Sequence, residues 1–121
     1  MHELSIMQGL HERVTEIAAA NRARRIARVA VDLGALSNVE PDLLREAFLA
    51  FREADPLLAG AEFEIRLIPL ALRCRACGAE TEPAGYRIRC GACGGAEVDV
   101  IRGEELLLRD VELEVESEVP G

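Results

Sequence analysis

The first two residues of the chain, Met1 and His2, could together hold a metal ion. The terminal amine, the backbone amide nitrogen of His2 and its imidazole Nδ1 can close fused chelate rings on one ion. Three nitrogens in one plane suit the square-planar geometry that Ni(II) and Cu(II) prefer. The amine and the amide must each release a proton, so we expect binding to depend steeply on pH. Taken alone, this pattern does not separate a chelate from a solvated N-terminal histidine.

The cysteines are a second set of candidate metal ligands. They form two CxxC units, Cys74 and Cys77, then Cys90 and Cys93. In a cytosolic chain, paired CxxC units predict a tetrahedral four-thiolate Zn(II) site rather than disulfides. A glycine follows each unit and lets the backbone turn its N–H groups toward the sulfurs. A rubredoxin-like iron site and a redox dithiol are the alternatives, although a redox motif needs only one CxxC unit.

Composition narrows the class of protein further. The 121 residues suffice for one domain or for one domain with a small insertion, and half of them are apolar, so a core can form. The formal net charge of −8 argues against a nucleic-acid partner, which would select a basic face. The sequence has no apolar run of about 20 residues to span a membrane, and the acidic Glu3 argues against a signal peptide. We therefore expect a cytoplasmic protein without a membrane partner.

Helices and strands must position these ligands, and two helices are predicted from apolar residues that recur at intervals of three and four. The first spans residues 4–21, and a capping box that begins at Ser5 would leave residues 1–4 extended. Pro41 opens the second helix at its first turn, and Asp55 ends it.

Three strands are predicted at 29–33, 62–70 and 106–116, the last two from alternating apolar and polar residues. Their polar faces carry both signs of charge, with Arg24 and Arg28 at the first strand and acidic residues on the others. We expect cross-strand ion pairs on one solvated face of the sheet.

The order of these elements predicts the fold. A strand–helix–strand connection joins parallel strands, and the cysteine ribbon then comes before the last strand of the same sheet. The fold class is α+β: a small three-stranded mixed sheet with two helices, plus an inserted four-cysteine zinc-ribbon domain. The predicted domains are residues 1–71 with 101–121, a discontinuous nickel-binding domain, and residues 72–100, the zinc ribbon.

The N-terminal Met1-His2-Glu3-Leu4-Ser5, the single sheet domain and the inserted ribbon together resemble the HypA/HybF family. These proteins are nickel metallochaperones for [NiFe]-hydrogenase maturation. Residues 28–34, 48–53 and 103–106 are also similar to the family, so the resemblance covers nearly the whole chain.

The resemblance implies a role in nickel delivery and no enzymatic activity. Ni(II) would be held at the N-terminus by Met1 and His2, and Zn(II) would be structural. A HypB-type GTPase would help to pass nickel to the [NiFe]-hydrogenase large subunit. The client hydrogenase, a role in urease maturation and a homo-oligomeric state stay open. Two departures matter: the ribbon has no histidine to add a nickel ligand, and Glu104 stands where Arg or Asn is usual.

Two acidic residues are candidates beside the chelate. Glu3 adjoins it and is counted with Met1 and His2 among the nickel-binding residues. Glu40 could reach the metal if the two helices start at the same end of the sheet. Its alternative role is that of an ordinary acid at a helix N-terminus, which the macrodipole favours. His11 lies further along the first helix and is expected on the surface or on a face of that helix.

Nickel delivery has two rivals from other classes of protein. A zinc-ribbon nucleic-acid or protein-interaction module without nickel function would use the ribbon arginines as phosphate contacts, but the net charge opposes it. A metal-dependent hydrolase needs an open zinc with a water ligand and a general base, whereas four thiolates close the site. The sequence has no P-loop, so any GTPase activity must come from a partner.

Overall fold

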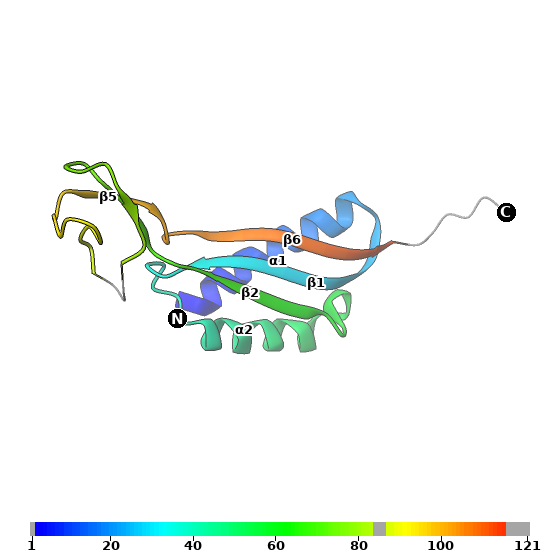
Figure 1. Ribbon diagram of the computed structural model, residues 1–121. Helices are drawn as coiled ribbons and strands as arrows, with labels where there is room; N and C mark the ends of the chain where they lie inside the picture. Colours follow the sequence, from blue (N-terminus) through cyan, green and yellow to red (C-terminus); the bar gives the residue numbers. More distant parts are fainter. Residues whose placement is uncertain (1, 84–86, 116–121) are drawn as a thin grey trace. The chain divides into compact units, whose positions relative to one another are not determined.

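A computed structural model of the chain describes residues 2–83 and 87–115 (Figure 1). Met1, the side chain of His2 and Glu116, the last residue of the third predicted strand, lie outside the described part. Within that part, no helix is long and apolar enough to cross a membrane. The elements are, in order, α1 His2–Ala20, β1 Ala23–Gly34, α2 Pro41–Ala54, the 3-10 helix η1 Pro56–Leu58, β2 Glu62–Ile68, β3 Ala71–Cys74, β4 Glu80–Thr81, β5 Val98–Arg102 and β6 Leu106–Val115.

The described residues form two compact units. The first contains residues up to Val31, the segment Val39–Ile65 and residues from Leu108 onwards. The second contains Asp32–Asn38 and Arg66–Leu107, including both CxxC units. Whether residues 72–100 fold as a domain of their own stays a prediction.

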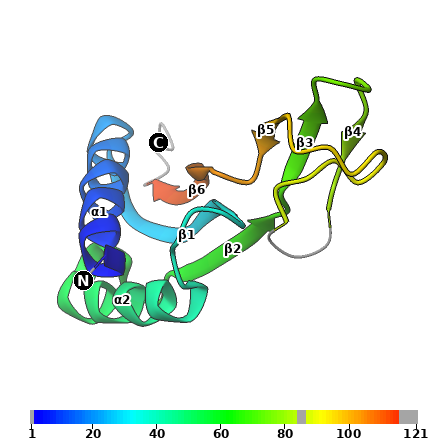
Figure 2. The ribbon, with the colours of Figure 1, turned by 90° about the vertical axis from the view of Figure 1, so that its left-hand side faces the viewer.

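The larger sheet is mixed, as predicted, with the strand order β2-β1-β6. Figure 1 shows β1 and β2 running in the same direction while β6 runs in the opposite one. Because parallel neighbours need a crossover, α2 connects β1 to β2, and the ribbon follows as an insertion between β2 and β6. Both helices cover one face of this sheet (Figures 1 and 2).

The sequence of α2 sets both its start and its buried face. Pro41 occupies the first turn, where its missing N–H costs no helical hydrogen bond, and Glu40 is the N-cap. Leu44 and Phe48, one turn apart, are buried, and the Phe48 ring stacks on Phe63 of β2 with centroids 4.5 Å apart. Burying a side chain of this kind contributes about 1.5–3 kcal/mol, so this face holds α2 against the sheet.

The start of α1 differs from the prediction. The capping box at Ser5 predicts extended residues at 1–4, but the helix begins at His2. Glu3 lies in the first turn, and its carboxylate accepts a hydrogen bond from the backbone N–H of Glu40, at 3.2 Å. Tertiary packing supplies most helix stability in proteins, so this contact with α2 outweighs the local capping signal.

Two strand ends also differ from the prediction. β1 begins at Ala23, before the predicted residue 29. Basic residues before residue 29 interrupt the apolar pattern that predicts the strand. Arg25 is one of them, and within the sheet it pairs with Glu114 of β6 at 2.6 Å. β2 ends at Ile68 instead of residue 70, because Pro69 has no N–H with which to continue the strand.

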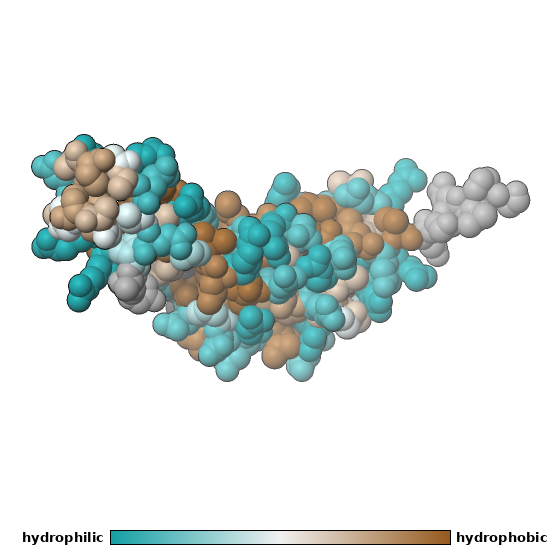
Figure 3. Space-filling model, in the orientation of Figure 1, coloured by the Kyte–Doolittle hydropathy of each residue, from teal (hydrophilic) through white to brown (hydrophobic). Residues whose placement is uncertain are grey.

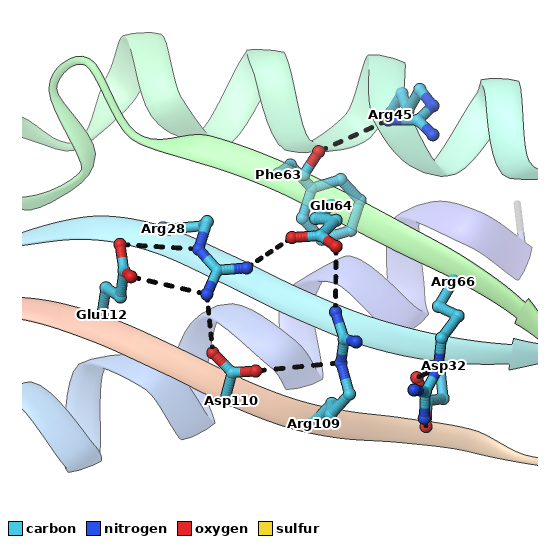
Figure 4. Close-up of polar contacts among 9 residues, drawn as sticks. All are labelled: Arg28, Asp32, Arg45, Phe63, Glu64, Arg66, Arg109, Asp110 and Glu112. Atoms are coloured by element: carbon cyan, nitrogen blue, oxygen red, sulfur yellow. Dashed lines mark hydrogen bonds and ion pairs between the residues drawn. The ribbon is translucent and has the colours of Figure 1, made fainter.

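Charged residues of all three strands form a network on the sheet face opposite the helices (Figure 4). Arg28 lies at its centre and pairs with Glu64 of β2 and with Asp110 and Glu112 of β6. A hydrogen bond from Arg109, and a further one from Arg28, hold the pKa of Glu64 below its usual value, although desolvation opposes this. The predicted cross-strand ion pairs are confirmed. Exposed pairs contribute only about 0–1 kcal/mol each, so their main effect is to favour one register of the strands.

Candidate metal centres

The ribbon sheet brings the two CxxC units together. β3 lies between β4 and β5 and is antiparallel to both. Cys74 ends β3, and Cys90 and Cys93 lie in the long segment that returns the chain to β5. Pairing of β3 with β5 therefore places the second CxxC unit beside the first, although they are distant in sequence.

Each CxxC unit folds into the same tight turn. Gly78 donates its N–H to the carbonyl of Cys74 at 2.9 Å, and the N–H of Cys77 points at the Cys74 sulfur at 3.4 Å. The second unit repeats this pattern around Cys90, with Gly94 in the place of Gly78. Both glycines have a φ of 75°, a left-handed conformation that is costly for other residues. The expected turn of backbone N–H groups toward the sulfurs is thus confirmed.

The four sulfur atoms converge on one point. All lie within 4.8 Å of one another, and the Cys74–Cys93 and Cys77–Cys90 sulfur pairs are each 3.6 Å apart. Four thiolates bound tetrahedrally to zinc at about 2.3 Å would lie about 3.8 Å apart, so the arrangement fits one zinc ion. A tetrahedral sulfur cage favours zinc over a metal that prefers a square plane. The cysteines are positioned for zinc, and binding itself stays a prediction.

Backbone N–H groups prepare two of the thiols for metal binding. The N–H groups of Cys93 and Ala92 lower the pKa of Cys90 to about 6, and the N–H of Cys77 is the main cause of a lowered pKa at Cys74. For the other two thiols a backbone N–H also lowers the pKa, but hydrogen bonds with neighbouring sulfurs outweigh it and raise the pKa overall. Thiolates are the ligand form, so a bound metal displaces protons and should be lost in acid.

Thr81 is a ribbon residue whose role the sequence analysis missed. Its Oγ1 accepts a hydrogen bond from the N–H of Gly91 at 2.9 Å, which ties β4 to the second CxxC unit. A Cβ added to Gly91 would lie 3.1 Å from the Cβ of Thr81, so the fit is close. A supporting threonine has no characteristic spacing from its ligands, and no local signal could have identified it.

Glu3 and Glu40, two of the predicted nickel residues, lie at the end of the first unit where α1 and α2 begin. The hydrogen bond from the Glu40 N–H to the Glu3 carboxylate shows that both helices start at the same end of the sheet. Glu40 is exposed, and its side chain makes no capping hydrogen bond. The condition under which Glu40 could reach an N-terminal metal is therefore met. Met1 and the His2 side chain lie outside the described residues, so the chelate stays a prediction.

The helical start at His2 favours the chelate in one respect. The first four N–H groups of an α-helix have no partner within the helix, so deprotonating the His2 amide breaks no helical hydrogen bond. The positive end of the helix macrodipole disfavours a cation there. The acidic side chains of Glu3, Glu40 and Asp42, in or beside the first helical turns, offset that effect.

His11 links the two helices. Its Nε2 lies 2.7 Å from Oδ2 of Asp55, and its ring packs on Phe51 with centroids 5.0 Å apart. The side chain is 25% exposed, which agrees with a position on a face of α1. In the described residues, the groups that converge as metal ligands are the four cysteines, and His11 is not among them.

Residues 103–106, which resemble the family, have a structural role in the second unit. The carboxylate of Glu105 accepts a hydrogen bond from the N–H of Gly103, and its carbonyl accepts one from Gly34 at 2.7 Å. A Cβ on Gly34 would lie only 2.2 Å from the Gly103 carbonyl oxygen, so glycine is required there. Glu104, the residue that departs from the family, is exposed.

Comparison with known proteins gives similarity over nearly the whole chain. Residues 1–113 match the family described as hydrogenase/urease nickel incorporation, metallochaperone, hypA. The chain is 42% identical over 118 residues to the hydrogenase maturation factor HypA of Shewanella sp. (strain MR-7), covering 98% of this chain and 99% of that protein. It is 37% identical over 114 residues to the HypA of Desulfitobacterium hafniense (strain DSM 10664 / DCB-2), covering 94% and 99%.

Two solved structures share the fold. One is the solution structure of the Ni metallochaperone HypA from Helicobacter pylori, with 29% identity and a TM-score of 0.67 over 94% of this chain and 98% of that chain. The other is a solution structure of a HypA protein, with 31% identity and a TM-score of 0.72 over 96% and 98%.

Proposed function

Because the chain belongs to the HypA family of hydrogenase/urease nickel-incorporation metallochaperones, we propose that it carries Ni(II) on its N-terminus for delivery to a [NiFe]-hydrogenase. The terminal amine of Met1 and the amide and imidazole of His2 would bind the ion in one plane. Glu3 and Glu40 would lie beside it. The observation that supports this most is the Glu40-to-Glu3 hydrogen bond, because it brings two acidic residues to the chain end that holds the nitrogen donors.

Incomplete coordination would allow the nickel to be released. The chain offers three strong nitrogen donors, so the fourth position falls to water, a nearby carboxylate or a group of the partner. A partner can then bind the ion before any existing bond breaks. We therefore expect a micromolar rather than a picomolar dissociation constant, which corresponds to about −8 kcal/mol.

The four cysteines would hold Zn(II) in a structural role. A cage of four thiolates is closed to water and substrate, so it would shape the ribbon and take no part in nickel transfer chemistry. We infer that the chain itself catalyses no reaction. Its partners in the maturation machinery would be a HypB-type GTPase and the hydrogenase large subunit, in the cytoplasm, where the thiols stay reduced.

A nickel titration of protein with its native N-terminus tests the site. We expect one Ni(II) per chain with a diamagnetic, square-planar spectrum. His2→Ala should abolish binding at this site and leave zinc content and fold unchanged. One extra residue before Met1 should do nearly as much harm, because it moves the amine out of the chelate ring. His11→Gln is the matched control, since it removes the other histidine and should leave nickel binding unchanged.

A transfer experiment tests delivery. Nickel-loaded protein is mixed with a metal-free HypB-type GTPase, and the nickel content of each protein is measured after separation. We expect nickel to distribute between them within minutes. In the nickel titration, a chain with one extra residue before Met1 that binds nickel as tightly as the native chain would show that the amine is not a ligand. Nickel that stays in place for hours at every partner concentration would indicate storage instead of delivery.

A further inference from the structure

A groove of about 510 Å³ lies between α2 and β2, and no described residue of either proposed metal centre lines it. Its apolar lining comes from Phe48 and Leu49 of α2 and from Phe63 and Ile65 of β2. Leu49 is 44% exposed. In the space-filling view, apolar and polar residues are interspersed over these two elements (Figure 3). Exposed apolar surface with a polar rim is typical of interaction sites.

The groove runs along an open sheet edge. Within the described residues, the sheet order leaves β2 with β1 as its one strand neighbour. A strand directs the N–H and C=O of alternate residues to opposite sides. The carbonyl of Phe63 points away from β1, because it accepts a hydrogen bond from Arg45 of α2 (Figure 4). Ile65, two residues further, therefore presents its N–H and C=O on the same outer side. Such an edge can accept a further strand.

Two arginines of α2 border this edge. Arg45 donates to the Phe63 carbonyl at 3.4 Å, and Arg52 donates to the Ala61 carbonyl at 3.0 Å. The Arg45 contact is long for a hydrogen bond, so it is easily exchanged, and each guanidinium has five N–H donors. The chain as a whole has a net charge of −8, but two cations border this apolar groove. They favour a partner segment that carries a carboxylate.

The acidic residues at the groove do not cancel this preference. Glu64 pairs with Arg28 and Arg109 on the opposite sheet face. Glu62, the first residue of β2, adjoins Ala61, whose carbonyl accepts the hydrogen bond from Arg52. A carboxylate from a partner should therefore lie beside Arg45.

We propose that β2 accepts an extended segment of a partner protein as an additional strand, with an acidic residue of that segment beside Arg45 and its apolar residues in the groove. A backbone N–H of the segment replaces Arg45 at the Phe63 carbonyl, and the released guanidinium binds the carboxylate. Main-chain hydrogen bonds supply the affinity, and the groove supplies the specificity. The site uses none of the nickel or zinc residues and does not depend on either metal.

A second copy of this chain fits the edge less well than an acidic segment. Pairing two β2 edges would bring Arg45 and Arg52 of both copies together, between two chains that each carry a net charge of −8. Charged side chains along an edge are a common means of preventing sheets from pairing with copies of themselves. Arg45 and Arg52 thus protect the edge until a segment of opposite charge displaces Arg45.

The test uses the full-length zinc-loaded protein and a blocked seven-residue peptide in which Val alternates with Thr and one Thr is replaced by Asp. Nuclear magnetic resonance follows amide shifts and hydrogen exchange. We expect the peptide to slow exchange at the amides of Phe63 and Ile65. Arg45→Glu should weaken binding about tenfold or more. Arg13→Glu makes the same charge change at an exposed position on α1 and should have no effect.

Two N-methylated peptides distinguish strand addition from non-specific binding of the peptide to the groove. Methylation of alternate amides should abolish binding in one register and spare it in the other. Equal binding of both peptides, or unchanged exchange at Phe63 and Ile65 at millimolar peptide, would overturn the proposal. So would a concentration-dependent dimer of the free protein that protects the same two amides, because the occupant would then be a second copy. His2→Ala should bind the peptide normally, so failure here is independent of the nickel site.

Discussion

At the scale of single residues, Glu3 has two roles to reconcile. Its carboxylate accepts the hydrogen bond from the Glu40 N–H, which satisfies a donor at the start of α2. In the proposed function the same carboxylate also lies beside a bound nickel ion. One oxygen can remain on the N–H while the negative charge offsets the ion, so the two roles are compatible.

Substitutions at Glu3 should separate these roles. Glu3→Ala removes the acceptor and should lower the free energy of unfolding by about 1 kcal/mol, as loss of a helix cap does. Glu3→Gln keeps an oxygen acceptor and loses only the charge, so we expect a smaller loss of stability but weaker nickel binding. Urea unfolding and nickel titration of both variants measure these effects. Equal destabilisation by both changes would show that an uncharged oxygen acceptor at this position contributes no stability.

The pair of His11 and Asp55 should make stability depend on pH. Burial raises the pKa of Asp55, but hydrogen bonds from His11 and the Leu57 N–H outweigh it, so the pKa is lowered overall. The stabilisation is therefore complete above the unfolded value of about 3.9 and is lost as pH falls through the lower folded value. The difference in free energy of unfolding between wild type and Asp55→Asn should shrink as pH falls below about 4. Comparing the two proteins cancels effects that they share, including acid loss of zinc. A difference in free energy of unfolding that stays constant with pH would contradict a stabilising role of the ionised Asp55 side chain.

At the scale of elements, the two candidate centres are positioned in different ways. Each CxxC unit carries its own geometry, because the turn at Gly78 or Gly94 and the N–H groups on sulfur lie within a few residues. The chain end depends on packing instead, since α1 and α2 must begin side by side for Glu3 to meet Glu40. Local sequence changes should therefore affect the zinc site more directly than the nickel site.

Alanine at two glycines should have opposite effects. Gly78 has a φ of 75° and open space around its missing side chain, so Gly78→Ala should cost about 1 kcal/mol of backbone strain. Competition with a chromophoric chelator should then show zinc affinity lowered roughly fivefold. Gly9 lies in α1, also with open space around it, so Gly9→Ala should raise the free energy of unfolding by about 0.5–1 kcal/mol. Unchanged zinc affinity in Gly78→Ala would mean that the turn tolerates a side chain.

At the scale of the whole molecule, the two units differ in what keeps each of them folded. The first has a core of helix and sheet residues, among them Met7, Val31, Leu44 and Phe48. The ribbon strands of the second bury little apolar side chain, mainly Ala71 and Leu72. Small regions of this kind need a metal or disulfides to stay folded.

Loss of a cysteine ligand should therefore unfold the ribbon selectively. We expect Cys74→Ser to lose zinc and to collapse the amide spectrum of residues 72–100, while amides of α1 and α2 keep their dispersion. Arg75→Ala, within the same CxxC unit, is the matched control. It removes only an exposed ion pair with Asp99 at 3.1 Å, worth about 0–1 kcal/mol, and should retain zinc. Collapse of the whole spectrum would show that the predicted domains do not fold separately.

The sequence alone determined the features that depend on neighbouring residues. The CxxC units and their glycines predict the turn at each cysteine pair, because the hydrogen bonds from the glycine N–H groups and those to the sulfurs are local. Apolar periodicity predicts both helices, and Pro41 marks the start of the second. Alternation of apolar and polar residues predicts β2 and β6. These patterns suffice because the spacing of side chains along one element is a local property. The order of elements then predicts the mixed sheet, because a parallel pair needs a crossover.

Only the tertiary structure decided which ends and edges meet. The start of α1 at His2, the meeting of Glu3 with Glu40 and the early start of β1 all depend on contacts between elements far apart in sequence. The contact of Arg45 with the Phe63 carbonyl is of the same kind. Local capping and charge patterns cannot specify such contacts, because packing of the helices on the sheet sets the distances between elements.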